Sequence, residues 1–209
     1  MTNINTHSKD SEQPAAKIYR LLAACFYPPQ KIIFEKERLF ENLHSMVKDS
    51  MPEASATYEQ LGICFAQHSE EELTVAYAEL FVGPFALEAP PYGSVYLGGA
   101  RRVMDDSTIE TMKLYEAAGL VLDDTQKEAP DHIAIELEFL YYLITKSIEA
   151  VSKGDNELFV RFEGIRSEFI NNYLGKWVGP FCENIRTKTK NSFYRALSDC
   201  LEASINCLR

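Results

Sequence analysis

Hydrophobic residues recur every three or four positions along most of the chain, which is the spacing of helices that bury one face. The first such series ends at Pro28 and Pro29, because proline lacks the N–H donor that a helix interior needs. The pattern resumes over residues 31–48, and Pro52 opens a further segment that reaches about Gln67. Since no segment alternates strictly between apolar and polar residues, the sequence predicts an all-α fold.

Capping side chains mark two further helix starts. Ser69 and Glu72 have the spacing of a capping box, in which each side chain bonds the other residue's backbone N–H. Ser107 and Glu110 have the same spacing. Gly119 stands where a helix end favours a left-handed residue. These signals predict helices that begin near residues 69 and 107.

The most apolar long segment predicts a central, buried helix from Pro130 to about Ser152, with Pro130 at its first position. At about 100° per residue, one face of this helix is apolar. Its members are Ile133, Leu137, Leu140, Tyr141, Ile144 and Ile148.

Glycine and proline interrupt the helices at two places. Residues 83–99 are rich in both but too apolar for a solvated linker, so we expect an ordered, packed loop. Gly179 and Pro180 are predicted to separate a helix over residues 155–174 from one over about 181–208.

The 209 residues suffice for one domain with a sizeable core. We expect residues 1–14 to form a flexible tail and residues 15–209 to form a single helical bundle, with a polar connection near 123–128 as a candidate hinge. The tail has no apolar run that would make a secretory signal. Charged residues interrupt the central apolar segment, which argues against a membrane span.

The net charge narrows the classes of partner. With 21 basic and 31 acidic residues, the formal charge is -10, which disfavours nucleic acid and suits a cationic ligand. The five cysteines include no C-x-x-C pair and are expected to be reduced core thiols of a cytoplasmic protein. They are Cys25, Cys64, Cys182, Cys200 and Cys207.

His132 and Glu136 lie four residues apart on an apolar stripe of the central helix. One interpretation is structural: Asp131 favours the positive helix start, and Glu136 bonds His132 or a distant hydroxyl. A second is an acidic lip beside an apolar groove. A third is a proton-transfer pair of an enzyme, although no substrate-orienting motif accompanies it.

The sequence contains no motif for metal binding, nucleophilic catalysis or nucleotide binding. A di-iron helical bundle needs Glu-x-x-His on two helices, and only Glu41 with His44 fits. There is no zinc spacing, no G-x-S-x-G nucleophile and no Gly-rich phosphate loop. The sequence therefore predicts no metal site and no bound cofactor, and no motif supports an enzymatic function.

Three segments together resemble the TorD/DmsD/NarJ family of redox-enzyme maturation chaperones, most closely its DmsD-like branch. They are residues 77–84 (YAELFVGP), residues 89–96 (APPYGSVY) and residues 128–139, which begin EAPDH. The resemblance implies the all-helical TorD-like chaperone fold and a monomer or domain-swapped dimer.

The resemblance also implies a function. Members are cytoplasmic chaperones, not enzymes, and they assist molybdenum reductases of the dimethyl sulfoxide or trimethylamine N-oxide type. Tat translocase components are further expected partners. They bind the client's twin-arginine signal peptide, in some members also its body, and delay export by the Tat pathway until the cofactor is inserted. The signal-peptide surface carried over from the family comprises Tyr77, Leu80, Phe81, Pro91, Tyr92, Ser94, Asp131 and His132.

The residue chemistry agrees with such a partner. An arginine pair followed by an apolar segment needs aromatic and proline walls and nearby carboxylates. Asp131 and Glu136 are the candidates for pairing with arginine. Ordinary core packing is the alternative for Tyr77, Leu80 and Phe81. A non-catalytic structural subunit of a reductase complex is the alternative function.

Overall fold

The computed structural model describes residues 13–83, 87–98, 103–121 and 128–209. Within these ranges the regular structure is helical, apart from one isolated antiparallel bridge between Tyr92 and His132. The fold class predicted from the sequence is therefore confirmed. Most of the expected tail and most of the expected hinge lie outside the described residues, although Pro14 already belongs to the first helix.

The helices follow the chain in this order: α1 (Pro14–Ala24), α2 (Lys31–Lys36), α3 (Leu39–Ser50), η1 (Pro52–Ala54), α4 (Ser55–Ala66), α5 (Glu70–Tyr77), η2 (Ala78–Val82), α6 (Gly93–Leu97), α7 (Asp106–Ala117), α8 (Ile133–Lys153), α9 (Asn156–Phe169), η3 (Ile170–Leu174), α10 (Gly175–Lys188) and α11 (Ser192–Asn206). η1 is a turn of 3₁₀ helix, and η2 and η3 are π-helical turns.

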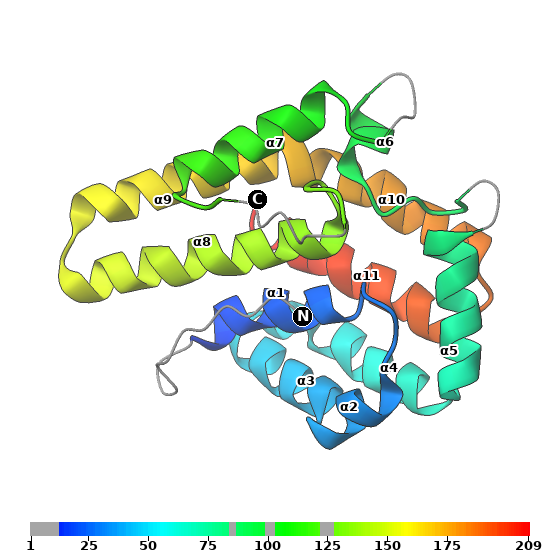
Figure 1. The fold of residues 1–209 in the computed structure, drawn as a ribbon. Helices are drawn as coiled ribbons and strands as arrows, with labels where there is room; N and C mark the ends of the chain where they lie inside the picture. Colours follow the sequence, from blue (N-terminus) through cyan, green and yellow to red (C-terminus); the bar gives the residue numbers. More distant parts are fainter. Residues whose placement is uncertain (1–12, 84–86, 99–102, 122–127) are drawn as a thin grey trace.

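Helix α8 lies at the centre of the molecule (Figure 1). It packs against α1 on one side and forms a long antiparallel hairpin with α9 on the other. Helices α3 and α4 lie below α1 in this view, and α11 packs against both α4 and α10. A single core connects these layers; among its largest fully buried side chains are Trp177, Tyr58, Phe26, Phe169 and Phe181.

The predicted helix over residues 31–48 is two helices. Arg38 between them has a φ of 49°, which a residue with a side chain adopts rarely. The break lets Phe34 and Phe40 both pack against Phe65, with ring centroids 6.0 and 4.3 Å from it. Packing in the core thus outweighs the continuous apolar pattern.

The predicted break at Gly179 and Pro180 is wrong. Helix α10 runs through both residues and ends only at Lys188. Proline inside a helix costs about 3 kcal/mol, but Pro180 is exposed while its helix neighbours Trp177 and Phe181 are fully buried. Burial of these rings holds the helix together. The next helix starts at the Asn191 cap, whose Oδ1 accepts from the Phe193 amide at 3.0 Å.

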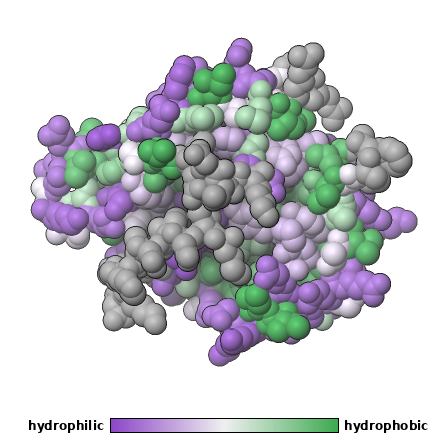
Figure 2. Space-filling view, in the orientation of Figure 1, coloured by the Kyte–Doolittle hydropathy of each residue, from purple (hydrophilic) through white to green (hydrophobic). Residues whose placement is uncertain are grey.

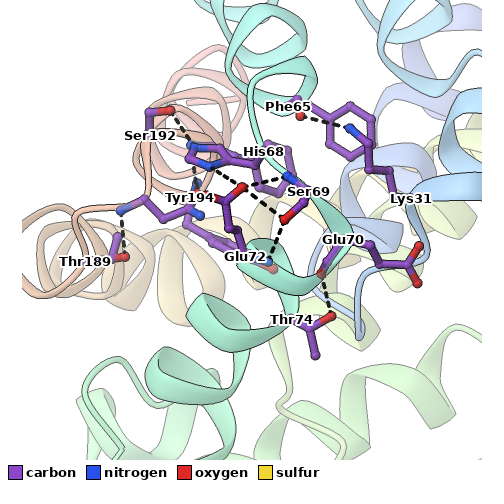
Figure 3. A network of polar contacts seen from close by, with 12 residues as sticks. Lys31, Phe65, His68, Ser69, Glu70, Glu72, Thr74, Thr189, Ser192 and Tyr194 are labelled. Carbon is purple, nitrogen blue, oxygen red and sulfur yellow. Dashed lines mark hydrogen bonds and ion pairs between the residues drawn. The ribbon is translucent and has the colours of Figure 1, made fainter.

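Of the two predicted capping boxes, one is present. Ser69 and Glu72 exchange both hydrogen bonds at the start of α5 (Figure 3). Helix α7 instead begins at Asp105, whose carboxylate accepts from the Ser107 amide at 2.9 Å. Asp105 thus takes the Ser107 amide that Glu110 would have bonded in the predicted box. Gly119 has the expected left-handed conformation, with a φ of 85°.

Helix α8 begins three residues later than predicted. Its N-cap is His132, whose Nδ1 accepts from the Ala134 amide at 3.1 Å. Pro130 lies before the helix, and its carbonyl accepts from the Tyr115 hydroxyl at 2.8 Å. On the predicted apolar face, Ile144 and Ile148 are only half-buried, because they line a cavity rather than a packed interface.

The cysteines are all free thiols. Four are buried as predicted, while Cys207 is exposed near the C-terminus and donates to Glu53. Within the described helices none is long and apolar enough to cross a membrane. On the face in Figure 2 the apolar patches are separate; one lies over α2, whose exposed apolar residues are Ile32 and Ile33.

Candidate functional site

Two of the three segments that carry the resemblance lie side by side. The Gly93 amide donates to the Asp131 carbonyl at 2.9 Å, and the Ile133 amide donates to the Pro91 carbonyl at 2.8 Å. The Asp131 carboxylate then accepts from the Ser94 amide at 2.7 Å. The proline-rich loop is therefore fixed to the start of α8, and its described part is ordered and largely buried as predicted.

The third segment packs behind this pair. Tyr77, Leu80 and Phe81 are all buried, at the point where α5 ends in the π-helical turn η2. The Leu80 carbonyl accepts from the Ala89 amide at 3.0 Å, which ties η2 to the loop. The structure thus brings the predicted residues together. Tyr77, Leu80 and Phe81, however, lie on the side of the site that packs into the core.

Aromatic rings form the solvent-facing side. The Tyr92 ring meets the His132 ring edge to face at 5.3 Å between centroids. On its other side, His132 stacks on Tyr27 at 6.1 Å. Tyr27 and Tyr92 are half-buried, whereas His132 is buried. Two tyrosines from distant parts of the chain therefore flank one histidine.

Each of these tyrosines donates a hydrogen bond to the carboxylate of a glutamate. The Tyr92 hydroxyl donates to Glu128 at 3.0 Å, and the Tyr27 hydroxyl donates to Glu138 at 3.1 Å. Both glutamates are half-buried. Burial raises the pKa of Glu138, an effect that the hydrogen bond from Tyr27 opposes. Burial and the neighbouring glutamates also raise the pKa of both tyrosine hydroxyls, which therefore remain donors.

The two predicted arginine partners lie deeper. Asp131 and Glu136 are each only 1% exposed. Asp131 Oδ1 has no hydrogen-bond partner among the described residues. Such an orphaned carboxylate oxygen is costly in a protein interior. Neither carboxylate presents an accessible oxygen to a ligand. Contrary to the expectation from the sequence, an arginine of the ligand therefore cannot pair directly with Asp131 or Glu136 in this conformation.

Glu136 bonds the indole of Trp177, whose Nε1 donates to Oε2 at 3.0 Å. The expectation of a His132 or hydroxyl partner is therefore wrong. Burial raises the pKa of Glu136 well above its ordinary value. Gly93 is needed beside this pair, because a Cβ there would lie 2.9 Å from Trp177 Nε1.

His132 and Glu136 do not form a proton-transfer pair. His132 Nδ1 caps α8, and the Glu136 carboxyl faces Trp177. Burial lowers the pKa of His132 to about 4, so its neutral form persists at physiological pH. The geometry gives the enzyme interpretation no support.

A second histidine, His68, lies near a serine and a glutamate, but the three are not arranged as a catalytic triad (Figure 3). His68 Nε2 lies 2.9 Å from the Ser192 hydroxyl, and His68 Nδ1 lies 3.8 Å from Glu72. The Glu72 carboxylate is already occupied by the Ser69 capping box. This network joins the starts of α5 and α11. The described residues include no cluster that could hold a metal, and His44 instead contacts the Ser55 hydroxyl at 3.1 Å.

Three residues of the site were missed as candidates by sequence reasoning: Tyr27, Glu128 and Glu138. Glu128 and Glu138 stand in the segment that carries the resemblance, so the charged positions of that segment were the signal that could have found them. Tyr27 follows α1, far away in sequence. Only its packing against His132 places it here.

Comparisons with known proteins show the family of the chain. Residues 48–183 match the family model described as nitrate reductase delta subunit. The chaperone protein TorD of Vibrio parahaemolyticus is 33% identical over 133 residues, covering 63% of this chain and 60% of that protein. The Tat proofreading chaperone DmsD of Salmonella typhi is 40% identical over 68 residues, covering 32% of this chain and 33% of that protein.

A crystal structure from Archaeoglobus fulgidus, assigned as a redox enzyme maturation protein, has the same fold. It superposes with a TM-score of 0.54 at 20% identity and covers 96% of this chain and 97% of that one. The matches to TorD and DmsD span less than two thirds of those relatives' lengths. Because the family model matches more than half of the sequence, the chain belongs to the nitrate reductase delta subunit family, the family of the TorD, DmsD and NarJ redox-enzyme maturation chaperones.

Proposed function

We propose that this protein is a cytoplasmic, non-catalytic chaperone that binds the twin-arginine signal peptide of a molybdoenzyme of the dimethyl sulfoxide or trimethylamine N-oxide reductase type. Binding delays export by the Tat pathway while the cofactor is inserted. The reductase body and components of the Tat translocase are further partners in this proposal. The names of the relatives TorD and DmsD support it.

The observation that carries the proposal is the pair of tyrosine–carboxylate contacts around His132. Tyr92 with Glu128 and Tyr27 with Glu138 each combine a half-buried aromatic ring with a half-buried carboxylate at its hydroxyl. A guanidinium group stacks on aromatic faces and accepts bidentate pairing with a carboxylate. The two tyrosine–glutamate pairs therefore provide one binding position for each of two adjacent arginines. The net charge of -10 favours the approach of a cationic peptide.

The site residues predicted from the sequence take two roles in this proposal. Tyr92 contacts the peptide, and Pro91 supports it from the loop. The remaining residues hold the surface in place from behind, through buried rings and through the hydrogen bonds of Asp131 and Glu136. They are Tyr77, Leu80, Phe81, Ser94, Asp131, His132 and Glu136.

Neutralising the half-buried acids tests this assignment. The double variant Glu128→Gln/Glu138→Gln should weaken an arginine-pair signal peptide about tenfold or more and a lysine-pair peptide by less, because lysine cannot pair bidentately. Calorimetric titration of the full chain measures both affinities. The peptides come from the reductases encoded beside this gene.

The buried acids provide the matched control. Asp131→Asn/Glu136→Gln should keep the preference for arginine over lysine, because those carboxylates support the site from within. Loss of the preference in this variant alone would assign recognition to the buried pair. Absence of saturable binding by any arginine-pair peptide to the wild-type protein would contradict the proposed function.

The description of the matched family model, nitrate reductase delta subunit, favours a second candidate. In it, the chain is a non-catalytic structural subunit of a reductase complex. Stoichiometric copurification with the mature, exported enzyme distinguishes this role, because a chaperone leaves its client before export.

A further inference from the structure

Helix α2 exposes an apolar side to solvent. Of its six residues only Phe34 is buried, whereas Ile32 is 74% and Ile33 is 42% exposed. The helix lies at the lower edge of the molecule in Figure 1, and its isoleucines form one of the separate apolar patches in Figure 2. Ile63 of α4 is 48% exposed and lines the same groove as Phe34, so it extends this surface. Contiguous exposed apolar residues mark sites of contact with other molecules.

A groove of about 430 Å³ lies beside these isoleucines, between α2, α3 and α4. The rings of Phe34, Phe40 and Phe65 form its floor. Gly62 also lines the groove, and a Cβ there would meet only Phe40 Cβ, at an ordinary contact distance of 3.4 Å. Packing therefore does not require glycine at this position, and the missing side chain keeps the groove open.

The charges around the groove favour a cationic occupant. Its lining includes Glu35, Glu41 and Glu59 but no lysine or arginine. Lys31 Nζ, just outside the lining, lies 3.2 Å from Glu35. Arg38 Nε lies 3.9 Å from Glu41, and both of these side chains are largely exposed. Glu59 is exposed and forms no ion pair with another described residue, so it remains open to a cation from another molecule.

Helix α2 itself carries the chemistry that this groove favours. Lys36 lies three residues after Ile33 and four after Ile32, so the three side chains share one side of the helix. Lys36 is exposed and, like Glu59, has no ion-pair partner within the described part of the chain. One surface thus holds both halves of a complementary contact: an apolar helix side with an unpaired lysine, and an apolar groove with an unpaired acid.

Two-fold symmetry lets both halves pair at once. In a two-fold dimer each copy makes the contact with the same surface, so a helix and a groove that lie side by side can each meet their counterpart on the other copy. We propose that a second copy of this chain docks on this surface, with α2 of each copy lying in the groove of the other. Ile32 and Ile33 cover the aromatic floor, and Lys36 meets Glu59 of the second copy.

One short helix and one groove form a small interface, which is typical of a weak, reversible dimer. No segment is exchanged between the copies, in contrast to a domain-swapped dimer. The groove lining includes no residue of the tyrosine–carboxylate surface. The inference therefore goes beyond the proposed function and does not depend on it.

Sedimentation velocity of the full chain over about a hundredfold range of concentration measures the association. The wild type should shift from monomer to dimer as the concentration rises. Ile32→Ser should weaken the dimer at least about tenfold, because a symmetric contact loses the side chain twice. The matched control is Val160→Ser, which changes a 67% exposed residue of α9 outside the groove and should leave the association unchanged.

Charge reversal tests how the two copies are aligned. Lys36→Glu and Glu59→Lys should each weaken the dimer about fivefold or more, because each places like charges opposite one another at two symmetric positions. The double variant Lys36→Glu/Glu59→Lys restores opposite charges and should recover the association of the wild type. Both residues are exposed, so circular dichroism should show an unchanged fold in all three variants.

Sedimentation as a monomer at every concentration overturns the proposal and leaves the surface to a partner of another sequence. A dimer that Ile32→Ser and both charge reversals leave unchanged forms through another face and overturns it as well. If each single reversal weakens the dimer and the double variant does not recover, the pairing of Lys36 with Glu59 is wrong.

Discussion

Two pairs of carboxylates lie between residues 128 and 138 and have opposite environments. Asp131 and Glu136 are buried and held by the Ser94 amide and the Trp177 indole. Glu128 and Glu138 are half-buried, and their partners are tyrosine hydroxyls at the surface. A short stretch of sequence thus places two acids in the interior and two at its edge.

The difference shows that exposure separates structural acids from acids that can meet a ligand. A buried carboxylate that already accepts a hydrogen bond must lose that bond and stay desolvated to take a new partner. A half-buried carboxylate keeps oxygen lone pairs within reach of solvent. The buried pair should therefore determine stability, and the half-buried pair should determine binding.

The largest expected effect on stability comes from truncating the buried pair. Glu136→Ala leaves the Trp177 N–H without a partner and opens a void. We expect the free energy of unfolding to fall by about 2–4 kcal/mol. Urea denaturation followed by circular dichroism measures the loss.

Glu136→Gln is its matched control, because the amide oxygen can still accept from the indole. It should cost less than about 1 kcal/mol. If both substitutions destabilise the protein equally, the hydrogen bond to Trp177 is not what Glu136 contributes.

Acid should destabilise the protein through His132. Burial lowers the folded-state pKa of His132 to about 4, against about 6.5 when unfolded. Below pH 6.5 the unfolded chain binds a proton that the folded chain refuses, so stability is fully present above pH 6.5 and falls as the pH drops toward 4. The contribution lost over this window is about 3 kcal/mol.

His132→Asn isolates this contribution, because asparagine can also cap α8 and does not titrate. The free energies of unfolding of wild type and variant are compared between pH 4 and 7. Glu136 and Glu138 have raised pKa values and contribute the opposite slope in both proteins. Parallel curves for the two proteins would contradict the assignment to His132.

The smallest effect is expected at the half-buried pair. Glu128→Gln/Glu138→Gln keeps an acceptor for each tyrosine hydroxyl and removes only charges near solvent. The free energy of unfolding should change by less than about 1 kcal/mol. A thermal melt beside the wild type checks this, and a loss as large as that of Glu136→Ala would remove the distinction between the two pairs.

Most helices were predictable because their signals are local. The capping box at Ser69 and the left-handed Gly119 were read correctly from neighbouring residues. The break at Arg38 and the continuity through Pro180 were not, because both follow from aromatic rings that pack across the core. Local propensity is a weak term when burial of a ring opposes it.

The candidate site was located from the sequence in part. The segments with Tyr92 and with Asp131 and His132 do meet, as their common motif implied. Their burial was not foreseen, because helical periodicity does not show which side of α8 the loop covers. Tyr27 was not foreseen because it joins the site only through contacts with residues more than a hundred positions away.

The sequence by itself determined the helical class, the acidic surface and the family, since these depend on spacing, composition and motif. The tertiary structure alone decided which acids are buried, which tyrosines accompany His132, and that the exposed isoleucines of α2 lie beside an acid-lined groove. The physical reason is that spacing along a helix sets which residues share a face, whereas exposure and pairing depend on what other segments cover that face.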